Sequence, residues 1–568
     1  MGTPEQGREW LPRTYDCKLI GAYAQTELGH GTFVRGLETT ATYDEKTEEF
    51  VMNSPTKTSY KWWPGGRKNN IFNLTFATTN FELYICFQVG HTANHAIVVA
   101  QLYIKDKHYG VQLFIVPIRC EKTHKPLQGI KVGDIGNKYG FSGVNNGFLG
   151  MENVRIPRKN MLMKNAQVLV DGKFIKSLNS KLNYGTMVLV RVIILQEMGY
   201  HISKAVTIAT RYSTVRRQCP INSDEPEVKV LDHVTQQMKL FPLIAKAIVF
   251  KLTSDSLWNI YNQVVVELKS GNLERLPELH ALSCCLKSVC TGEAAQSVEI
   301  CRRATGGHGF LQSSGFPDIY IAVTAAETYE GENTILLLQT ARYLMKVWNQ
   351  IAQGDFNVPP TVAYLVTVFK SKNKLVQWDG SIPGIINAFE AVAAGKINKA
   401  SNNLQQCIGN GSSLEVATNE SSIELAACSE SHCKVFLLSC GYKLLHEASQ
   451  KCPSLGLGSI FMQLCELYAV YLCLKSLGDL LQFVEINSDD IENLQKRLKV
   501  VLSQLRPNAV GLVDGFDIPD GILNSVLGTF DGNVYERIFD AAMMSPLNQE
   551  QVNKSFELHI KPFIQSNL

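Results

Sequence analysis

The apolar pattern of this chain changes character near Pro157, and this change limits the folds that the chain can adopt. Before that point, apolar residues form short runs rich in β-branched and aromatic side chains, with turn residues between them, as β-strands do. The clearest strand-like segments lie at 39–43, 49–52, 97–104 and 111–118. The first two flank a polar turn and predict a hairpin. The region from about 20 to 160 is therefore predicted to be a small antiparallel barrel or sandwich.

After Pro157 the apolar residues recur three and four positions apart, which is the helical period. A first group of helices is predicted at 184–217, 231–268, 278–304 and 334–352. A connector at 353–380, which contains Pro359 and Pro360, precedes a second group at 384–403, 421–447, 460–484 and 491–504. The chain is therefore predicted to be α+β, with a β domain followed by two mainly helical domains. The expected boundaries are 1–160, 161–352 and 381–568.

Composition excludes several classes of partner. The chain has 568 residues, with 55 basic against 52 acidic side chains, so no global field attracts nucleic acid or anionic lipid. No signal peptide and no apolar run long enough to span a membrane are visible. The 15 cysteines form no C-x-x-C pair, so no metal site is predicted. The grouping of Cys284, Cys285 and Cys290 predicts small buried thiols on a helix.

Two segments of the β region place polar groups beside glycines. In the first (23–31), Thr26 precedes glycines that permit close backbone approach, and its hydroxyl is suited to bond a heteroaromatic ring or a phosphate. In the second (61–66, KWWPGG), two adjacent Trp residues precede Gly65. One indole is suited to the core and the other to a planar ligand. By itself, the first segment is better explained as a glycine-containing turn with a polar lining, and the second as a core Trp pair followed by a turn.

Two further segments lie in the first helical group. Gly306, Gly307 and Gly309 follow a long helix and two arginines, which is typical of a helix C-cap but also exposes backbone N–H groups to an anion. Glu330 is followed by a glycine just before a helix, so the backbone there can turn sharply and present the carboxylate to a cleft. Glu332 fits an ordinary helix-capping role.

Taken together and in this order, the segments resemble the peroxisomal acyl-CoA oxidases, the oxidase branch of the acyl-CoA dehydrogenase superfamily. No motif typical of hydrolases or P-loop nucleotide triphosphatases is present. The resemblance covers nearly the whole chain and is carried by 23–43, 61–66, 124–136, 155–168, 211–218, 276–283, 306–310 and 328–334 (TYEGENT). It implies a central antiparallel β-barrel followed by two mainly helical domains, in a homodimer.

The resemblance also implies roles for individual residues. Glu330 takes the position of the base that removes the α-proton of the substrate. Thr26 and Gly65 take positions that contact FAD. Arg216 takes the position of a pyrophosphate contact made from a neighbouring subunit. The turn formed by the three glycines at 306, 307 and 309 takes a position beside the cofactor.

The implied reaction converts a fatty acyl-CoA to a trans-2-enoyl-CoA in peroxisomal β-oxidation. FAD accepts the hydride and passes the electrons to molecular oxygen, which gives hydrogen peroxide. The implied compartment is the peroxisome. The C-terminal residues Ser566, Asn567 and Leu568 resemble the S-K-L import address with Asn at the middle position, so an import receptor is an expected partner. The alternative is an accidental tail.

Two departures from the family pattern keep another function open. The chain begins just before the β domain, so the leading helical domain of the family is expected to be absent. Residues 67–88 interrupt the loop after Gly66, either as an extra hairpin or as sequence from an unspliced gene segment. The alternative to an active oxidase is therefore a catalytically impaired paralogue or isoform that acts as a binding or dimerisation partner. An electron-transferring-flavoprotein-linked dehydrogenase is disfavoured by the C-terminal helical domain and the KWWPGG form.

Overall fold

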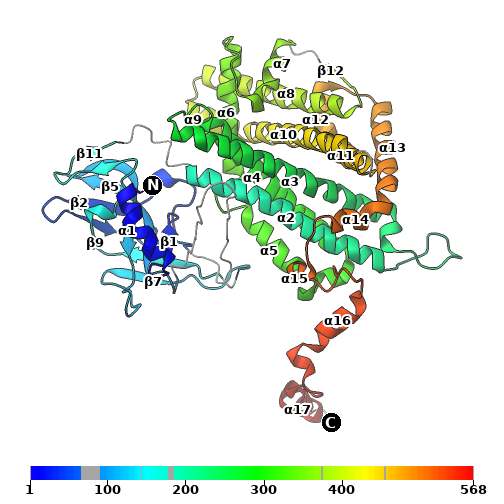
Figure 1. Cartoon of the computed structure of the whole chain (residues 1–568), viewed down its shortest axis with the longest axis horizontal. Helices are drawn as coiled ribbons and strands as arrows, with labels where there is room; N and C mark the ends of the chain where they lie inside the picture. The colour runs from blue at the N-terminus through cyan, green and yellow to red at the C-terminus, as the bar shows by residue number, and fades with distance from the viewer. Residues whose placement is uncertain are drawn as a thin grey trace. The chain divides into compact units, whose positions relative to one another are not determined.

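A computed structural model describes residues 2–64, 90–141, 144–176, 185–371, 375–452 and 456–566. The chain divides into two compact units, Met1–Thr186 and Met187–Leu568. Among the described residues, the first unit contains most of the β-strands, and the second is mostly helical (Figure 1). The predicted succession of a β region and a helical region is therefore confirmed. The division of the helical region at 353–380 stays a prediction.

The first unit begins with helix α1 (Pro4–Tyr15) and continues with short strands. The strands are β1 (Gly21–Ala24), β2 (Thr40–Asp44), β3 (Glu49–Asn53), β4 (Lys61–Trp62), β5 (His95–Ile104), β6 (Lys107–Pro117), β7 (Ile130–Asp134), β8 (Gly147–Met151), β9 (Val154–Pro157), β10 (Gln167–Val168) and β11 (Phe174–Ile175). Six of them form one sheet in the order β1-β5-β2-β3-β9, with β6 paired to β5. A second sheet has the order β4-β8-β7, and β10 pairs with β11.

Strand β5 is the centre of the larger sheet. It is buried along most of its length, which explains its nearly continuous apolar sequence. One edge of this long strand pairs with β1 and then with β2, both parallel, and its other edge pairs with β6, antiparallel. The predicted β2–β3 hairpin is present, with Thr42 opposite Val51. The wholly antiparallel sheet that the sequence predicted is wrong, because strand direction depends on long-range crossovers that the local apolar pattern does not encode.

The second unit is built from long helices joined by short ones. The long helices are α2 (Gly185–Val215), α3 (Val234–Lys269), α4 (Leu276–Ala304), α6 (Asn333–Ala352), α8 (Ile382–Gly409), α10 (Ser422–Lys451), α11 (Leu457–Lys475) and α13 (Ser488–Leu505). The shorter helices are α5 (Phe316–Ala326), α7 (Tyr364–Lys370), α9 (Leu414–Glu420), α12 (Leu477–Phe483), α14 (Ala509–Asp514), α15 (Asp520–Leu523), α16 (Val534–Met543) and α17 (Lys561–Ser566). A short strand pair, β12 (Val376–Gln377) with β13 (Val484–Glu485), ties the connector to α12.

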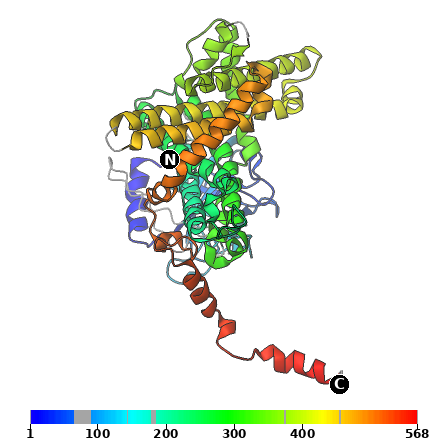
Figure 2. The same cartoon turned by 90° about the vertical axis from the view of Figure 1, so that its right-hand side faces the viewer.

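The helices follow the apolar pattern of the sequence. Helix α6 buries one stripe, which includes Leu337, Ala341, Leu344 and Trp348, against α4 and α10. Helix α4 lies among α3, α5, α6 and α10 and is buried on most sides, which explains its many small residues. The predicted connector is not wholly irregular, because it contains α7. Figure 2 shows that α16 and α17 reach away from the other helices of this unit as a C-terminal arm.

One helix among the described residues, α11, is long and apolar enough to cross a membrane by length and composition alone. It packs against α3, α10 and α13, and its buried residues include Leu464, Leu467 and Val470. A buried core helix meets the same criteria, so this single helix is weak evidence for a membrane span.

Candidate active site

Glu330 lies in the turn between α5 and α6. Its backbone has φ 57°, a left-handed conformation that is unusual for a residue with a side chain, and Gly331 follows with φ 109°. The next residue, Glu332, is the N-cap of α6, and its carboxylate accepts a hydrogen bond of 3.2 Å from the backbone N–H of Ile335. The predicted capping role of Glu332 is thus confirmed. The two strained residues turn the chain sharply just before the helix begins.

Two buried cations from other helices hold this turn. Arg191 of α2 donates from Nε to the Glu330 carbonyl oxygen at 3.1 Å. Lys287 of α4 donates from Nζ to the carbonyl oxygens of Glu327 and Gly331, at 3.2 and 2.7 Å, and to Asn333 Oδ1 at 3.0 Å. Arg191 is 6% exposed and Lys287 is fully buried. Neither cation was expected from the sequence. A lone lysine among the small and apolar residues of α4 was the available signal.

The surroundings of Glu330 set its proton affinity. Burial raises the pKa of this half-buried carboxyl group, and the positive charges of Arg191 and Lys287 oppose that increase. Burial lowers the pKa of Lys287 to about 8. The arrangement is therefore a carboxyl group with a raised pKa on a rigid turn beside two cations. Such a group is suited to accept a proton from a weakly acidic carbon.

The other groups beside Arg191 carry no charge near neutral pH. Arg191 Nη1 lies 3.2 Å from Cys284 Sγ, which in turn lies 3.8 Å from His280 Nε2. Burial raises the pKa of Cys284 to about 11 and lowers that of His280 to about 4. The predicted burial of the Cys284, Cys285 and Cys290 thiols is confirmed.

In the first unit, Thr26 lies where two chain segments meet. Its carbonyl oxygen accepts a 2.9 Å hydrogen bond from the backbone N–H of Trp62, and the backbones of Glu27 and Lys61 form an isolated antiparallel β-bridge. The side chains of Glu27 and Lys61 form a fully buried ion pair at 2.9 Å. The Thr26 side chain is half-buried, and its hydroxyl makes no hydrogen bond to any described residue.

The loop that follows is only partly described. Trp62 stacks on Phe148, with ring centroids 5.9 Å apart, and Trp63 is exposed. The Trp62 ring therefore packs within the unit and the Trp63 ring does not, which agrees with the different roles that the sequence suggested for the two indoles. Gly65 and the insertion at 67–88 lie outside the described residues.

Arg216 and the glycine turn lie at one end of the second unit. Arg216 follows the last residue of α2, and a hydrogen bond with Tyr535 raises its pKa. One turn earlier on α2, the Tyr212 hydroxyl lies 2.9 Å from Nδ1 of His308, which belongs to the glycine turn. The structure therefore brings the end of α2, which carries Arg216, together with the predicted glycine turn.

The three glycines of this turn differ in their backbone conformation and in the space around them. Gly306 follows Thr305, the C-cap of α4, with φ 65°, so a glycine ends this helix at the first position beyond the cap, as the sequence predicted. A Cβ atom on Gly306 or Gly307 meets no heavy atom within 4 Å, whereas one on Gly309 lies 2.3 Å from the Arg302 carbonyl oxygen. Gly309 therefore permits close packing, and the other two leave open space in which a ligand can approach the backbone.

Glu330 and Arg216 do not belong to one cluster within the chain. Arg191, which holds the Glu330 turn, lies near the start of α2, and Arg216 follows its end. The 24 residue steps from Arg191 to Val215 span about 36 Å, at about 1.5 Å for each helical residue. Glu330 and Arg216 are thus separated by most of the length of α2.

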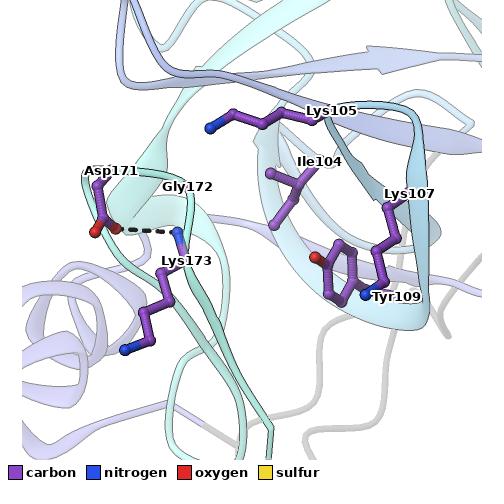
Figure 3. A pocket seen from close by; sticks show the side chains of 7 residues that line it. All are labelled: Ile104, Lys105, Lys107, Tyr109, Asp171, Gly172 and Lys173. Carbon is purple, nitrogen blue, oxygen red and sulfur yellow. Dashed lines mark hydrogen bonds between the residues drawn. The ribbon is translucent and has the colours of Figure 1, made fainter.

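A hollow of about 380 Å³ in the first unit is no part of these clusters (Figure 3). It is lined by Ile104, Lys105, Lys107, Tyr109, Asp171, Gly172 and Lys173. Lys105 forms a 2.8 Å ion pair with Glu45, and Lys107 lies over the Tyr109 ring, 5.5 Å from its centroid. Two of its three lysines are thus already engaged within the chain. Among the described residues, no group of His, Cys, Asp and Glu is arranged to hold a metal ion.

Two family models match the helical unit. Residues 184–345 match the acyl-CoA oxidase C-alpha1 domain, and residues 381–565 match the acyl-CoA oxidase model. The chain belongs to the acyl-CoA oxidase family, as the resemblance of its sequence motifs predicted. It is 49% identical over 568 residues to acyl-coenzyme A oxidase 1 of Drosophila melanogaster, an alignment that covers 100% of this chain and 81% of the relative. It is 44% identical to peroxisomal acyl-coenzyme A oxidase 1 of Rattus norvegicus, in an alignment that covers 100% of this chain and 83% of the relative.

Solved structures of the same family share the fold. Acyl-CoA oxidase 1 of Arabidopsis thaliana superposes with a TM-score of 0.91 at 38% sequence identity. The superposition covers 100% of this chain and 83% of the Arabidopsis chain. Acyl-CoA oxidase-2 of Caenorhabditis elegans, solved with FAD, ascaroside-CoA and ATP, also has a TM-score of 0.91 at 38% identity, with 100% and 81% covered. The acyl-CoA dehydrogenase-like fold is therefore established for this chain.

Proposed function

We propose that the protein oxidises fatty acyl-CoA to trans-2-enoyl-CoA with Glu330 as the catalytic base. The observation that carries the proposal is the turn between α5 and α6, where a carboxyl group of raised pKa is held by Arg191 and Lys287. Family membership supplies the reaction class, and a carboxyl group in this state is suited to remove the weakly acidic α-proton of a thioester. The intact turn supports catalysis over the alternative of an impaired paralogue.

FAD is the cofactor of this activity, as it is in the solved oxidase of Caenorhabditis elegans. Bound FAD supplies the acceptor for the β-hydrogen and transfers the electrons to molecular oxygen. The described residues fit such a group. The Thr26 hydroxyl has no hydrogen bond to described residues, and Gly306 and Gly307 leave their backbone open to close approach. We assign cofactor contacts to Thr26, Gly65 and Arg216 and to the glycine turn.

The role of this chain in the reaction is positioning and proton transfer. The rigid turn presents the Glu330 carboxylate, and exclusion of water by the acyl chain of the substrate strengthens every electrostatic interaction there. The proton passes from the substrate α-carbon to the Glu330 carboxylate. Arg191 and Lys287 limit the rise in the pKa of that carboxyl group, because their charges oppose the effect of desolvation.

We also propose a homodimer, which the separation of Glu330 from Arg216 supports. Because about 36 Å of helix lie between the Glu330 turn and Arg216, one bound cofactor is best reached by Glu330 of one subunit and Arg216 of another. The C-terminal arm also exposes apolar side chains that a second copy of the chain can cover. They include Phe539, Met544, Leu547, Leu558 and Phe563. Removal of residues 534–568 is expected to give a monomer in analytical ultracentrifugation.

The peroxisome is the compartment, because the relatives from Rattus norvegicus and Homo sapiens are named peroxisomal acyl-coenzyme A oxidases. We propose that the import receptor binds the C-terminal tail. Ser566 ends α17, and Asn567 and Leu568 lie outside the described residues. We also propose that the strands of the first unit approach a barrel. The six-stranded and three-stranded sheets of this unit share one core, in which Phe50 and Val98 of the larger sheet are grouped with Leu149 of the smaller one.

Anaerobic reduction of the bound flavin tests the proposed base. Wild-type protein is expected to lose its flavin absorbance on addition of a fatty acyl-CoA, whereas Glu330→Gln retains the colour and reacts about 10²- to 10⁴-fold more slowly. Glu327→Gln, on the same turn, is the matched control and is expected to react normally. Undiminished reduction by Glu330→Gln contradicts the assignment.

A further inference from the structure

Lys287 is a fully buried cation whose hydrogen bonds all go to one short segment. Its ammonium group has three donors. They are taken by the carbonyl oxygens of Glu327 and Gly331 and by the side-chain oxygen of Asn333. These acceptors lie on both sides of Glu330. The residue is 0% exposed, although a buried ammonium group is costly unless it is well paired.

The segment that Lys287 holds is a strained one. Glu330 has φ 57° and Gly331 has φ 109°, and such conformations persist only where the surrounding structure fixes them. Nearby contacts complete the restraint. Asn333 also bonds Thr291, one helical turn further along α4, and its carbonyl oxygen accepts a 2.7 Å hydrogen bond from the Ser288 hydroxyl. Helix α4 therefore holds the turn through three polar side chains, Lys287, Ser288 and Thr291, and Lys287 makes the most hydrogen bonds to it.

We propose that Lys287 is a positioning residue for the oxidation, and that its ammonium group fixes the turn in the conformation that presents the Glu330 carboxylate to the substrate. This inference rests on the proposed function of Glu330 as the base. Lys287 acts through Glu330 and takes no proton from the substrate. Besides its hydrogen bonds, its positive charge opposes the rise in the pKa of Glu330 that burial causes.

The charged groups around Glu330 determine how the removal of Lys287 changes the pKa of the Glu330 carboxyl group. Arg191 faces it from α2 and Lys287 from α4, while Glu327 and Glu332 belong to the same turn. His280 and Cys284 of α4, beside Arg191, are uncharged near neutral pH, because burial lowers the pKa of His280 and raises that of Cys284. Loss of the Lys287 charge leaves burial opposed by Arg191 alone. The pKa of Glu330 then rises, and less carboxylate is present at a given pH.

Two substitutions separate the hydrogen bonds of Lys287 from its charge. Lys287→Gln keeps an N–H donor near the turn but removes the charge, and Lys287→Met removes both. We expect the acid limb of the pH profile of anaerobic flavin reduction to move to higher pH in both variants. We expect the limiting rate of Lys287→Met to fall about 100-fold, as small displacements of catalytic groups do, and that of Lys287→Gln to fall less.

The matched control is Lys246→Met. Lys246 of α3 is also buried, at 6% exposed, but its ammonium group pairs with Glu293 and Ser297, away from the turn. This variant loses a buried lysine and is expected to keep the wild-type acid limb. A general loss of stability is expected in both the Lys246→Met and the Lys287→Met variants. A shift of the acid limb to higher pH is expected only when Lys287 is replaced.

The outcomes separate this inference from the function on which it rests. A wild-type acid limb in Lys287→Gln, together with an inactive Glu330→Gln, overturns the role of Lys287 and leaves Glu330 as the base. An active Glu330→Gln overturns the proposed function itself. If Lys287→Met does not fold, the acid limb of Lys287→Gln decides the question alone.

Discussion

The ammonium group of Lys61 lies 2.9 Å from Glu27 Oε1, and both side chains are fully buried. The same carboxylate accepts hydrogen bonds from the backbone N–H groups of Glu38 and Thr39, at 2.8 and 2.9 Å. Lys61 also donates to the Gln25 carbonyl oxygen at 3.2 Å. This pair therefore joins the segment that carries Thr26 to the segment that leads to Gly65, the two predicted flavin contacts of the first unit.

Lys61→Met is expected to destabilise the protein by about 3–5 kcal/mol, because it leaves the Glu27 carboxylate buried without its partner. Binding of FAD is expected to weaken as well, since the two segments lose their link. Denaturant unfolding and flavin titration measure the two effects. Lys18→Met is the control, because Lys18 pairs with Asp16 at the surface and such a pair contributes about 0–1 kcal/mol. Equal stabilities for the two variants contradict the prediction.

The stability that this pair provides is expected to disappear in acid. Burial by itself raises the pKa of Glu27, but the charge of Lys61 and the hydrogen bonds from Glu38 and Thr39 outweigh it and leave the pKa below the ordinary 4.5. The stabilisation is therefore fully present above about pH 4.5 and is lost as the pH falls through the lower value of the folded state. Unfolding of wild type and Glu27→Gln, compared from pH 7 downward, is expected to show a difference that shrinks in that window.

The activity of the enzyme is expected to fall at acid pH with a midpoint above 4.5. The active form of Glu330 is the carboxylate, and burial raises its pKa above that ordinary value. Protonation therefore removes the base at a higher pH than for an exposed glutamate. The rate of anaerobic flavin reduction as a function of pH measures the midpoint. A midpoint at or below 4.5 is incompatible with a buried base.

Gly331→Ala is expected to lower both stability and activity. The backbone there has φ 109°, and a Cβ atom lies 2.7 Å from Leu336 Cδ2, so the turn has to shift. The strain corresponds to about 1–3 kcal/mol. Gly511→Ala in α14 is the control, because a Cβ atom there meets nothing within 4 Å and alanine favours the helix by about 0.5–1 kcal/mol. Thermal melting and flavin reduction distinguish the two.

Several local features could be predicted from the sequence because neighbouring residues determine them. The hairpin of β2 and β3 follows from apolar runs that flank a polar turn. Glu332 caps α6 because a carboxylate before a helix start can bond the free N–H groups of its first turn. Gly306 ends α4 because glycine adopts positive φ readily.

The direction of the strands was not predictable in the same way. Residues 21–24 and 40–43 pair in parallel with β5, which lies more than fifty residues further along the chain. Alternation of apolar and polar side chains reports which face of a strand is buried, but it is the same for both directions. The mixed sheet therefore depends on the path of the chain between its strands.

The sequence by itself determined the family, the division into a β and a helical region, and the position of Glu330 in a turn before a helix. These rest on local patterns and motifs, which the chain carries wherever it folds. Only the tertiary structure decided what surrounds that carboxylate. Arg191 and Lys287 are separated from their acceptors at Glu330 and Gly331 by 139 and 44 residues, and packing of α2 and α4 brings them to the turn. The burial that raises the pKa of Glu330 arises from the same packing, so no local pattern encodes it.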